Sequence, residues 1–309
     1  MGKYKIYTPA GLSSFFEACI FDEKGNIIED PSIKGARGGG FTLEKGTITT
    51  TTIDENNKEV EVYINGKKEN AVTTKNAVKL LLNFLNKKDI GVKVYHKISL
   101  PIGAGFGTSA SGALGAILSL SYELGHPISI INAIRLSHIA DVLSYTGLET
   151  AEGFATGGVV LITEPGTFWN AEVEKIAYSR DILIVAAYFE PIKKESILKS
   201  IDALVELNKV AKETMKNVLK YPTVDNLLKE SRIFAEKSGI GDKEMLKISD
   251  ELVKNGAIGA TQNMIGRAVH CAVYKKTLSK IVDLLKQYTE NVYVSKIHDG
   301  GPLIYSYYQ

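Results

Sequence analysis

Apolar and polar residues alternate along much of the first 100 residues, which is the period of half-buried β-strands. Strands are predicted over residues 3–9, 41–46, 47–54 and 59–66, with turn residues such as those at 56–57 and 65–66 between them. The last three are expected to form an antiparallel meander. A helical period then predicts a helix over 72–88, followed by a strand over 91–100.

The rest of the chain alternates helices and apolar runs. Helices are predicted over 109–124 and 129–145, then buried strands after the glycines at 157–158 and over 181–189. Residues 193–254 read as mainly helical, with breaks at 221–222 and 238–241. A helix over 279–288 and strands over 291–297 and 303–308 complete the pattern. It predicts an α+β protein with two closely packed domains, 1–155 and 156–309.

A glycine-rich stretch joins the strand that ends at 100 to the helix that follows it. Glycines at 103, 105 and 107 let the backbone turn with positive φ and expose successive N–H groups, and such a nest at a helix start favours an anion. Hydroxyls that can cap the helix, touch phosphate or ligate Mg²⁺ follow at Thr108, Ser109 and Ser111. The stretch lacks both the Walker A ending and the Rossmann glycine spacing. It is interpreted as a nucleotide-phosphate loop, with a hydroxyl-capped turn without ligand as the alternative.

Composition narrows the class of protein without naming a function. The 309 residues are 44% apolar and 23% charged, which is typical of a soluble globular protein. The net charge of +2 gives no case for a nucleic-acid partner, and no apolar run has the length of a membrane span. No signal-peptide core is present, so a cytoplasmic protein is expected. Cys19 and Cys271 are too few for a disulfide framework or a zinc site.

Three further segments carry polar groups that could meet a ligand. Ser13 and Ser14 could hydrogen-bond a substrate or merely cap a helix. Arg37 stands among glycines that would let an anion approach, or it belongs to a solvated hairpin. Asp141 shares a helix face with His138 and could join Ser109 at Mg²⁺ if the two helices pack side by side. An exposed helical aspartate is the alternative, and His138 is interpreted as structural.

Together these segments resemble the GHMP kinases, which include galactokinase, homoserine kinase, mevalonate kinase and phosphomevalonate kinase. Their phosphate loop has the form P-x-x-x-G-x-G-S-S-A, and here it stands at Pro101 to Ala110 with Thr108 in place of the first serine. Within that superfamily the chain is most similar to the archaeal pantoate kinases of coenzyme A synthesis. The resemblance rests on PAGLSSFFE, DPSIKGARGGG, LPIGAGFGTSASGALGA, SHIADVLSYTGLETAEGFATGGVV and ATQNMIG.

The resemblance implies a ribosomal-S5-like N-terminal domain and a ferredoxin-like C-terminal domain, with the site between them. It implies ATP and Mg²⁺ as cofactors, with Ser109 and Asp141 directed at the metal. The residues expected around the ATP phosphates are Pro101, Gly103, Ala104, Gly105, Phe106, Gly107, Thr108, Ser109, Ala110 and Ser111. The residues expected to face the acceptor substrate are Ser13, Ser14, Arg37, Gly38 and Gly157.

One departure from the family pattern affects the catalytic base. Pantoate kinases usually read T-G-L-G-D where this chain reads T-G-L-E-T, so Thr150 occupies the aspartate position. Glu149 and Glu152 are neighbouring carboxylates, but neither holds the matching place. Phosphoryl transfer depends mainly on positioning and charge neutralisation, and homoserine kinase also lacks that aspartate, so the loss does not exclude kinase activity.

A second departure affects the acceptor. The pantoate branch tends to place an arginine in the strand after Gly157-Gly158, and this chain has none there. Gly11 also replaces the histidine of the family's first motif. These differences favour pantothenate slightly over pantoate as the small-molecule substrate. A homoserine- or mevalonate-type acceptor and a non-catalytic nucleotide-binding protein remain alternatives, and a homodimer is compatible with the sequence.

Overall fold

The structure is a computed structural model. It describes residues 3–87, 89–148, 150–167, 170–190, 201–264 and 266–306.

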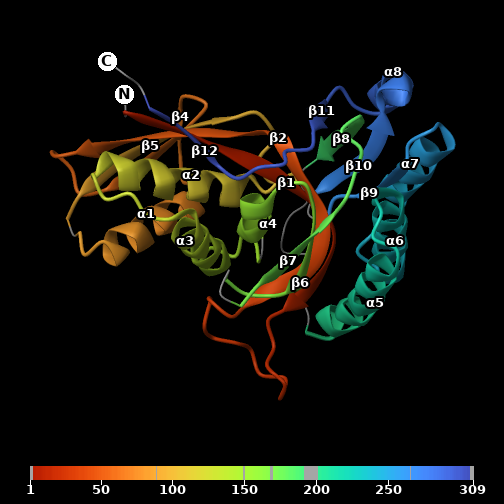
Figure 1. The fold of residues 1–309 in the computed structure, drawn as a ribbon, viewed down its shortest axis with the longest axis horizontal. Helices are drawn as coiled ribbons and strands as arrows, with labels where there is room; N and C mark the ends of the chain where they lie inside the picture. Colours follow the sequence, from red (N-terminus) through yellow and green to blue (C-terminus); the bar gives the residue numbers. More distant parts are fainter. Residues whose placement is uncertain are drawn as a thin grey trace.

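Two long antiparallel strands, β1 (Tyr4–Cys19) and β2 (Gly35–Asp54), organise the larger of two sheets (Figure 1). Its strand order is β12-β1-β2-β5-β3-β4, and it is extended by β6, which pairs with the first part of β2, and by β7, which pairs with β6. The remaining strands are β3 (Val60–Ile64), β4 (Lys67–Glu69), β5 (Gly91–Ile98), β6 (Val159–Glu164), β7 (Glu172–Ile176) and β12 (Leu303–Ser306). Strand β2 pairs with β6 along its first part, up to Phe41, and with β5 along its second part, from Thr47.

Four helices lie together beside this sheet in Figure 1. They are α1 (Val72–Phe84), α2 (Thr108–Glu123), α3 (Ile130–Leu143) and α4 (Thr150–Thr156). Helix α2 is buried along almost its whole length, as its run of small and aliphatic residues requires. A Cβ on Gly115 would lie 2.5 Å from the Thr49 hydroxyl, so only glycine lets α2 come this close to β2.

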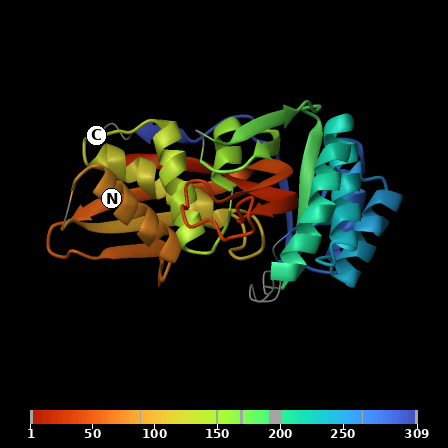
Figure 2. The same cartoon turned by 90° about the horizontal axis from the view of Figure 1, so that it is seen from below.

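The smaller sheet has the order β11-β8-β10-β9 and is antiparallel throughout. Its strands are β8 (Ile182–Glu190), β9 (Gly259–Gln262), β10 (Arg267–Tyr274) and β11 (Val292–Lys296), and its helices are α5 (Ile201–Lys220), α6 (Val224–Lys237), α7 (Lys243–Lys254) and α8 (Lys275–Lys286). In Figure 2 helices α5 to α7 stand as a layer at the end of the molecule remote from α1. One apolar core joins both sheets, since Phe41 of β2 and Ile184 of β8 belong to the same buried cluster.

The α+β fold class and the arrangement around two sheets are confirmed, but several predicted elements are wrong in detail. Strand β1 continues through Pro9 to Phe16, and the two strands predicted over 41–54 are one. The meander is also wrong, because β3 pairs in parallel with β5, Val62 opposite Val94, and not with β2. Helix α4 and strands β7, β9 and β10 were not predicted. The parts of predicted elements at 193–200 and 307–308 lie outside the described residues.

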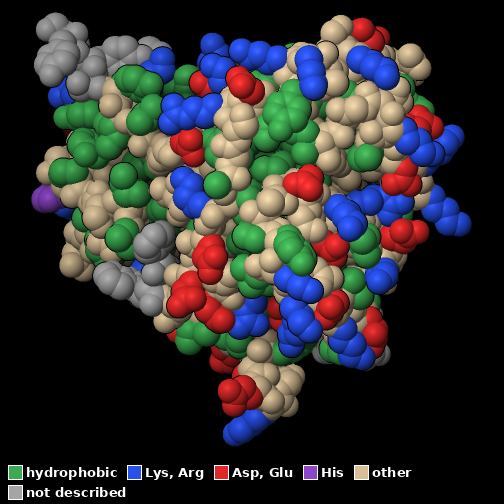
Figure 3. Space-filling view, turned by 45° about the vertical axis from the view of Figure 1, so that its right-hand side comes forward, with side chains coloured by type: hydrophobic (Ala, Val, Ile, Leu, Met, Phe, Trp, Pro, Cys, Tyr) green, Lys and Arg blue, Asp and Glu red, His purple; other side chains and the backbone are tan. Residues whose placement is uncertain are grey.

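The larger sheet draws strands from both ends of the chain. Strands β6, β7 and β12 all follow residue 155, yet they belong to the sheet built on β1 and β2. The division at 155 therefore remains a prediction. None of the described helices combines the length and apolar character needed to cross a bilayer. On the face shown in Figure 3, acidic and basic side chains are interspersed, in keeping with the net charge of +2.

Candidate active site

The glycine-rich stretch forms a turning loop that leads straight into α2. Gly103, Gly105 and Gly107 have φ values of 77°, 79° and 60°, a conformation that favours glycine. Gly107 is the N-cap of α2, and no described side chain caps the helix. The first amides of α2 thus keep their donors for a ligand, at the positive end of the helix dipole.

The loop is held from behind through two of its carbonyl groups. The Gly11 amide of β1 donates to Phe106 O at 3.1 Å, and Asn263 Nδ2 donates to Ala104 O at 3.0 Å. Both Ala104 and Phe106 are buried, whereas Gly103, Gly105 and Gly107, which alternate with them, are partly exposed. These two hydrogen bonds hold the backbone of the loop in place, and the glycines lie on its more exposed side.

The loop hydroxyls do not all face the same way. Ser111 is fully buried, and its Oγ lies 2.9 Å from the hydroxyl of Thr8 on β1. Thr108 is buried at the helix start, and Ser109 is partly exposed. Ser109 is therefore the most accessible of the three hydroxyls, as its expected role at a metal requires, and Ser111 serves to join α2 to β1.

Helices α2 and α3 pack side by side, as the metal-site prediction required. Ser137 Oγ donates to Ala110 O at 3.2 Å, and Asp141 follows one turn later on α3. Asp141 is buried, and its carboxylate accepts a hydrogen bond from the Thr146 hydroxyl. A side chain on Gly147 would collide with the other carboxylate oxygen. The aspartate is therefore held in one orientation near the start of α2.

Thr150 opens α4 and lies against the phosphate loop. A Cβ on Gly107 would come within 2.7 Å of Thr150 Cγ2. The structure thus brings the loop, Asp141 and Thr150 into one neighbourhood. Thr150 offers a hydroxyl, which does not act as a base near neutral pH, and Glu149 lies outside the described residues.

Glu152 is turned away from the loop and fully buried. Its Oε1 lies 3.2 Å from His138 Nδ1, out of line for a hydrogen bond, and both side chains are inaccessible to solvent. Burial lowers the pKa of His138, but the Glu152 charge, the Lys34 carbonyl and Asp141 raise it above its usual value. Burial raises the pKa of Glu152, although His138 opposes that shift. His138 and Glu152 form a structural pair behind the site.

The two serines predicted to face the acceptor point in opposite directions. Ser13 is exposed and shares a strand face with Gly11, which touches the loop. Ser14 is fully buried, and its hydroxyl lies 2.8 Å from His270 Nε2 on β10. Of the pair, Ser13 is the one placed to meet a ligand.

The structure sets Arg37 in an ion cluster. Its guanidinium donates to Thr163 O and to Glu164, both at 2.8 Å, and lies 3.7 Å from Glu17. Lys212 of α5 contacts the same Glu17 carboxylate, so the cluster lies where α5 covers β1. Arg37 pairs with Glu17 of β1, and Glu17 lies six residues along β1 from Gly11, which contacts the loop. Six residues of extended strand span about 20 Å, so Arg37 lies far from the loop.

The glycines near Arg37 and before β6 serve close packing of backbone. A Cβ on Gly38 would strike the β1 backbone at Phe15 O. A Cβ on Gly157 (φ 65°) would lie 2.7 Å from His298 O and from the Gly300 backbone. The structure does not bring Gly38 or Gly157 to the loop, and their acceptor roles stay predictions.

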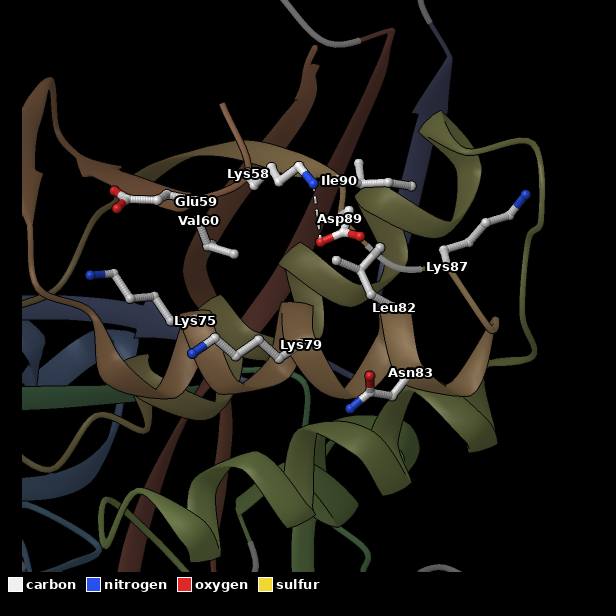
Figure 4. A pocket seen from close by; sticks show the side chains of 10 residues that line it. All are labelled: Lys58, Glu59, Val60, Lys75, Lys79, Leu82, Asn83, Lys87, Asp89 and Ile90. Atoms are coloured by element: carbon white, nitrogen blue, oxygen red, sulfur yellow. Dashed lines mark ion pairs between the residues drawn. The ribbon is translucent and has the colours of Figure 1, made fainter. Parts of the chain in front are cut away.

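The hollow in Figure 4 lies elsewhere, beside α1 and the ends of β3 and β5. It has a volume of about 720 Å³ and is lined by Lys58, Glu59, Val60, Lys75, Lys79, Leu82, Asn83, Lys87, Asp89 and Ile90. Lys58 pairs with Asp89 at 3.4 Å, and Lys58 and Lys79 are exposed. Solvated lysines around an open hollow do not fix a ligand, so the loop geometry locates the candidate site.

Sequence reasoning missed Asn263, His270 and Thr146. Asn263 stands in the segment compared with the family's third motif, and His270 is a lone histidine in the apolar run RAVHCAVY. Both are buried polar residues beside apolar neighbours, which is a signal for a hydrogen-bond partner. Nothing in the linear pattern identified those partners, because they lie more than 150 residues away.

Comparison with known proteins places this geometry in a family. Residues 72–148, which include the loop and Asp141, match the GHMP kinases N-terminal domain. This part of the chain is therefore a GHMP kinase N-terminal domain. The whole chain is 26% identical to a pantoate kinase of Thermococcus kodakarensis over 97% of each chain. It is 25% identical to a pantoate kinase of Methanocaldococcus jannaschii, covering 91% of this chain and 97% of that one.

Solved structures agree with this assignment. A phosphotransferase related to the coenzyme A biosynthesis pathway superposes with a TM-score of 0.86 at 25% identity, covering 98% of this chain and 99% of the other. A Methanococcus jannaschii mevalonate kinase shares the fold, with a TM-score of 0.71 at 16% identity over 95% and 98% of the two chains. The family match and these relatives make the protein an ATP-dependent kinase of small molecules.

Proposed function

We propose that this kinase transfers the γ-phosphoryl group of Mg·ATP to the primary hydroxyl of pantoate. The observation that carries the proposal is the left-handed glycine loop at the start of α2, with Asp141 and Thr150 beside it. Support for the acceptor comes from relatives named pantoate kinase that cover nearly the whole chain.

The loop and the metal ligands would share the charge of the phosphates. Amides of the loop and of the first turn of α2 donate to the ATP phosphates, at the positive end of the helix. Mg²⁺ takes few protein ligands and neutralises phosphate charge, and Asp141 and Ser109 are suited to hold it. No group of three or more His, Cys, Asp or Glu side chains forms a metal cluster within the described ranges, which fits such a phosphate-dependent ion.

The acceptor would enter from the exposed side of Ser13. Ser13 donates to or accepts from the acceptor, while Thr150 packs against Gly107 and positions the loop. With a hydroxyl at position 150, transfer relies on in-line placement and charge stabilisation more than on a protein base. Arg37 is engaged by two carboxylates, so its proposed contact with the acceptor carboxylate would require it to leave one of them.

Pantothenate is the second acceptor to weigh, because the strand after Gly158 carries no arginine. The strand residues Val159 to Ile162 are buried in the sheet, and none of them is cationic. Because three relatives are named pantoate kinase, we propose pantoate and not pantothenate as the acceptor. Both acceptors carry the same primary hydroxyl, so the distinction rests on the carboxylate alone.

An ADP-release assay with Mg·ATP and one acceptor at a time tests the proposal. We expect turnover with pantoate, with kcat/KM at least about tenfold above that for pantothenate, homoserine or mevalonate, because one mismatched polar group costs about that factor. Preference for pantothenate would revise the acceptor. ATP binding without turnover on any of the four would overturn the kinase assignment.

Replacing Asp141 tests the metal role directly. Asp141→Asn keeps the size of the side chain and removes its charge, and we expect kcat/KM to fall about 10²–10³-fold. A shift in the Mg²⁺ concentration needed for half-maximal rate should accompany the loss. The matched control is Asp283→Asn, an exposed acid on α8, which should leave the rate unchanged. An unchanged rate in Asp141→Asn would remove Asp141 from the metal site.

A further inference from the structure

A buried chain of hydrogen bonds runs from β1 through the smaller sheet to the phosphate loop. Ser14 Oγ lies 2.8 Å from His270 Nε2, His270 Nδ1 lies 2.7 Å from Asn263 Oδ1, and Asn263 Nδ2 donates to Ala104 O at 3.0 Å. All four residues are fully buried. The chain therefore connects residues from three distant parts of the sequence away from solvent.

The direction of every bond in the chain is fixed by its last acceptor. A backbone carbonyl can only accept, so the amide nitrogen of Asn263 faces Ala104, and its oxygen accepts from His270 Nδ1–H. Burial lowers the pKa of His270 to about 3, so the ring is neutral and its Nε2 accepts from the Ser14 hydroxyl. Each donor has one acceptor, which makes a satisfied and rigid network.

The carbonyl that the chain holds belongs to a peptide group at the centre of the loop. Because a peptide is planar and trans, holding Ala104 O on one side directs the Gly105 N–H to the other. Gly11 holds Phe106 O in the same way and so orients the Gly107 N–H. Within the described chain, neither of these two N–H groups has a backbone partner.

The backbone of Gly266 also packs against Ala104. With φ at 94°, it lies so near the loop that an added Cβ would stand 3.0 Å from Ala104 Cα. The segment that holds Asn263 and Gly266 thus touches Ala104 from behind with both a hydrogen bond and its backbone. This leaves the opposite side of the loop for a ligand.

We propose that Ser14, His270 and Asn263 are positioning residues for ATP, which hold the Ala104–Gly105 peptide so that the Gly105 N–H donates to a phosphate oxygen. The inference rests on the proposed ATP site but not on the identity of the acceptor. It gives Ser14 a role opposite to the one expected from the sequence, because the side chain acts on the loop and not on the acceptor.

The test compares nucleotide affinity in three variants of the full chain. Asn263→Asp keeps the shape and loses the donor to Ala104, and Ser14→Ala removes only the first hydroxyl of the chain. Thr74→Val is the matched control, because Thr74 also bonds a buried histidine, His96 Nε2, at 3.1 Å, in a network that does not include the loop. Affinity for a non-hydrolysable ATP analogue with Mg²⁺ is measured by calorimetry, together with the KM of the acceptor at saturating ATP.

We expect nucleotide to bind about tenfold or more weakly to Asn263→Asp and about threefold more weakly to Ser14→Ala, since a hydrogen bond to a charged group has about that effect. The acceptor KM should stay within about twofold. Thr74→Val should bind as the wild type does. If Asn263→Asp does not fold, Ser14→Ala alone decides the question.

Four results would count against the inference. Unchanged nucleotide affinity in both variants, or equal weakening in Thr74→Val, would overturn it while leaving the proposed function intact. A rise in acceptor KM with unchanged nucleotide affinity in Ser14→Ala would return Ser14 to the acceptor site. A wild-type protein that binds no nucleotide would overturn both proposals, whereas nucleotide binding without pantoate turnover would affect the proposed function alone.

Discussion

His270 and His138 are both buried polar side chains, but their surroundings differ in charge. His270 lies among Ser14, Asn263 and the ring of Phe41, whose centroid is 5.9 Å away. None of these groups can carry a charge at neutral pH. His138 faces the buried carboxylate of Glu152 at 3.2 Å. Burial alone drives the pKa of His270 down to about 3, while the carboxylate reverses that effect at His138 and raises its pKa.

The difference in proton content determines what each ring can hold. Neutral His270 donates through Nδ1 and accepts through Nε2, so it can pass an orientation from Ser14 to Asn263. His138 Nε2 lies 3.2 Å from Pro31 O and 2.9 Å from Lys34 O, so it must donate there. Its Nδ1 faces the Glu152 carboxylate, whose charge favours a second proton on the ring. His270 connects Ser14 to Asn263 through two hydrogen bonds. His138 on α3 contacts the segment before β2 and the Glu152 carboxylate on α4.

Removing Glu152 should have the largest effect on stability. Glu152→Ala leaves His138 buried without its counter-charge, and we expect the free energy of unfolding to fall by about 3–5 kcal/mol. Denaturant titration measures the change. Glu164→Ala is the control, because this carboxylate also contacts a cation but is about half exposed, and it should cost under about 1 kcal/mol. Similar losses in the two variants would erase the distinction between the buried and exposed pairs.

The pH dependence of stability should reveal the neutral histidine. The unfolded chain protonates His270 below its usual pKa of 6.5, whereas the folded chain resists until about 3. Its stabilising contribution is therefore complete above 6.5 and is lost as pH falls toward 3, by up to about 1.4 kcal/mol per pH unit. In His270→Gln, the free energy of unfolding should depend less steeply on pH below 6.5, by the slope that about one bound proton produces. His96, whose pKa burial lowers to about 4, remains in the variant and should preserve part of the slope.

The titration of His138 should run in the opposite sense and give the smallest effect. Because its folded pKa is raised, its contribution is present below 6.5 and is lost as pH rises through the folded value. Imidazole NMR shifts should show His138 still protonated just above 6.5. In Glu152→Gln the main charge that opposes burial is removed, and the pKa of His138 should fall. If His138 titrates identically in the wild type and in Glu152→Gln, Glu152 is not what raises the pKa of His138.

Local chemistry in the sequence was enough to predict the glycine-rich turn and the start of α2. Glycine spacing and hydroxyls are short-range signals, and they predicted a turn, a helix start and an anion site together. The same reasoning failed where glycine serves another purpose. Pro9 and Gly11 in β1 and the glycines of β2 suggested loops, but they allow close approach between strands and helices that lie far apart in the sequence.

Non-local pairing accounts for most of what the sequence did not predict. The parallel pairing of β3 with β5 joins residues 32 positions apart, and the bond between Asn263 and Ala104 joins residues 159 positions apart. Periodicity reports which residues face a core but not which strand or carbonyl lies opposite. Asp141 was predicted because a helix face is a local property, and its clamp by Thr146 and Gly147 was not.

The pairing of β12 with β1 has a consequence for how the chain is made. Tyr4 to Tyr7 pair with Leu303 to Ser306. One edge of β1 therefore stays unpaired until residues about 300 positions later have been translated. At ordinary ribosomal speeds that interval is roughly 15–60 s. An unpaired strand edge attracts other strands throughout such a delay. The larger sheet can be completed only when translation of this region ends, which makes the nascent chain a natural client for chaperones that shield open edges.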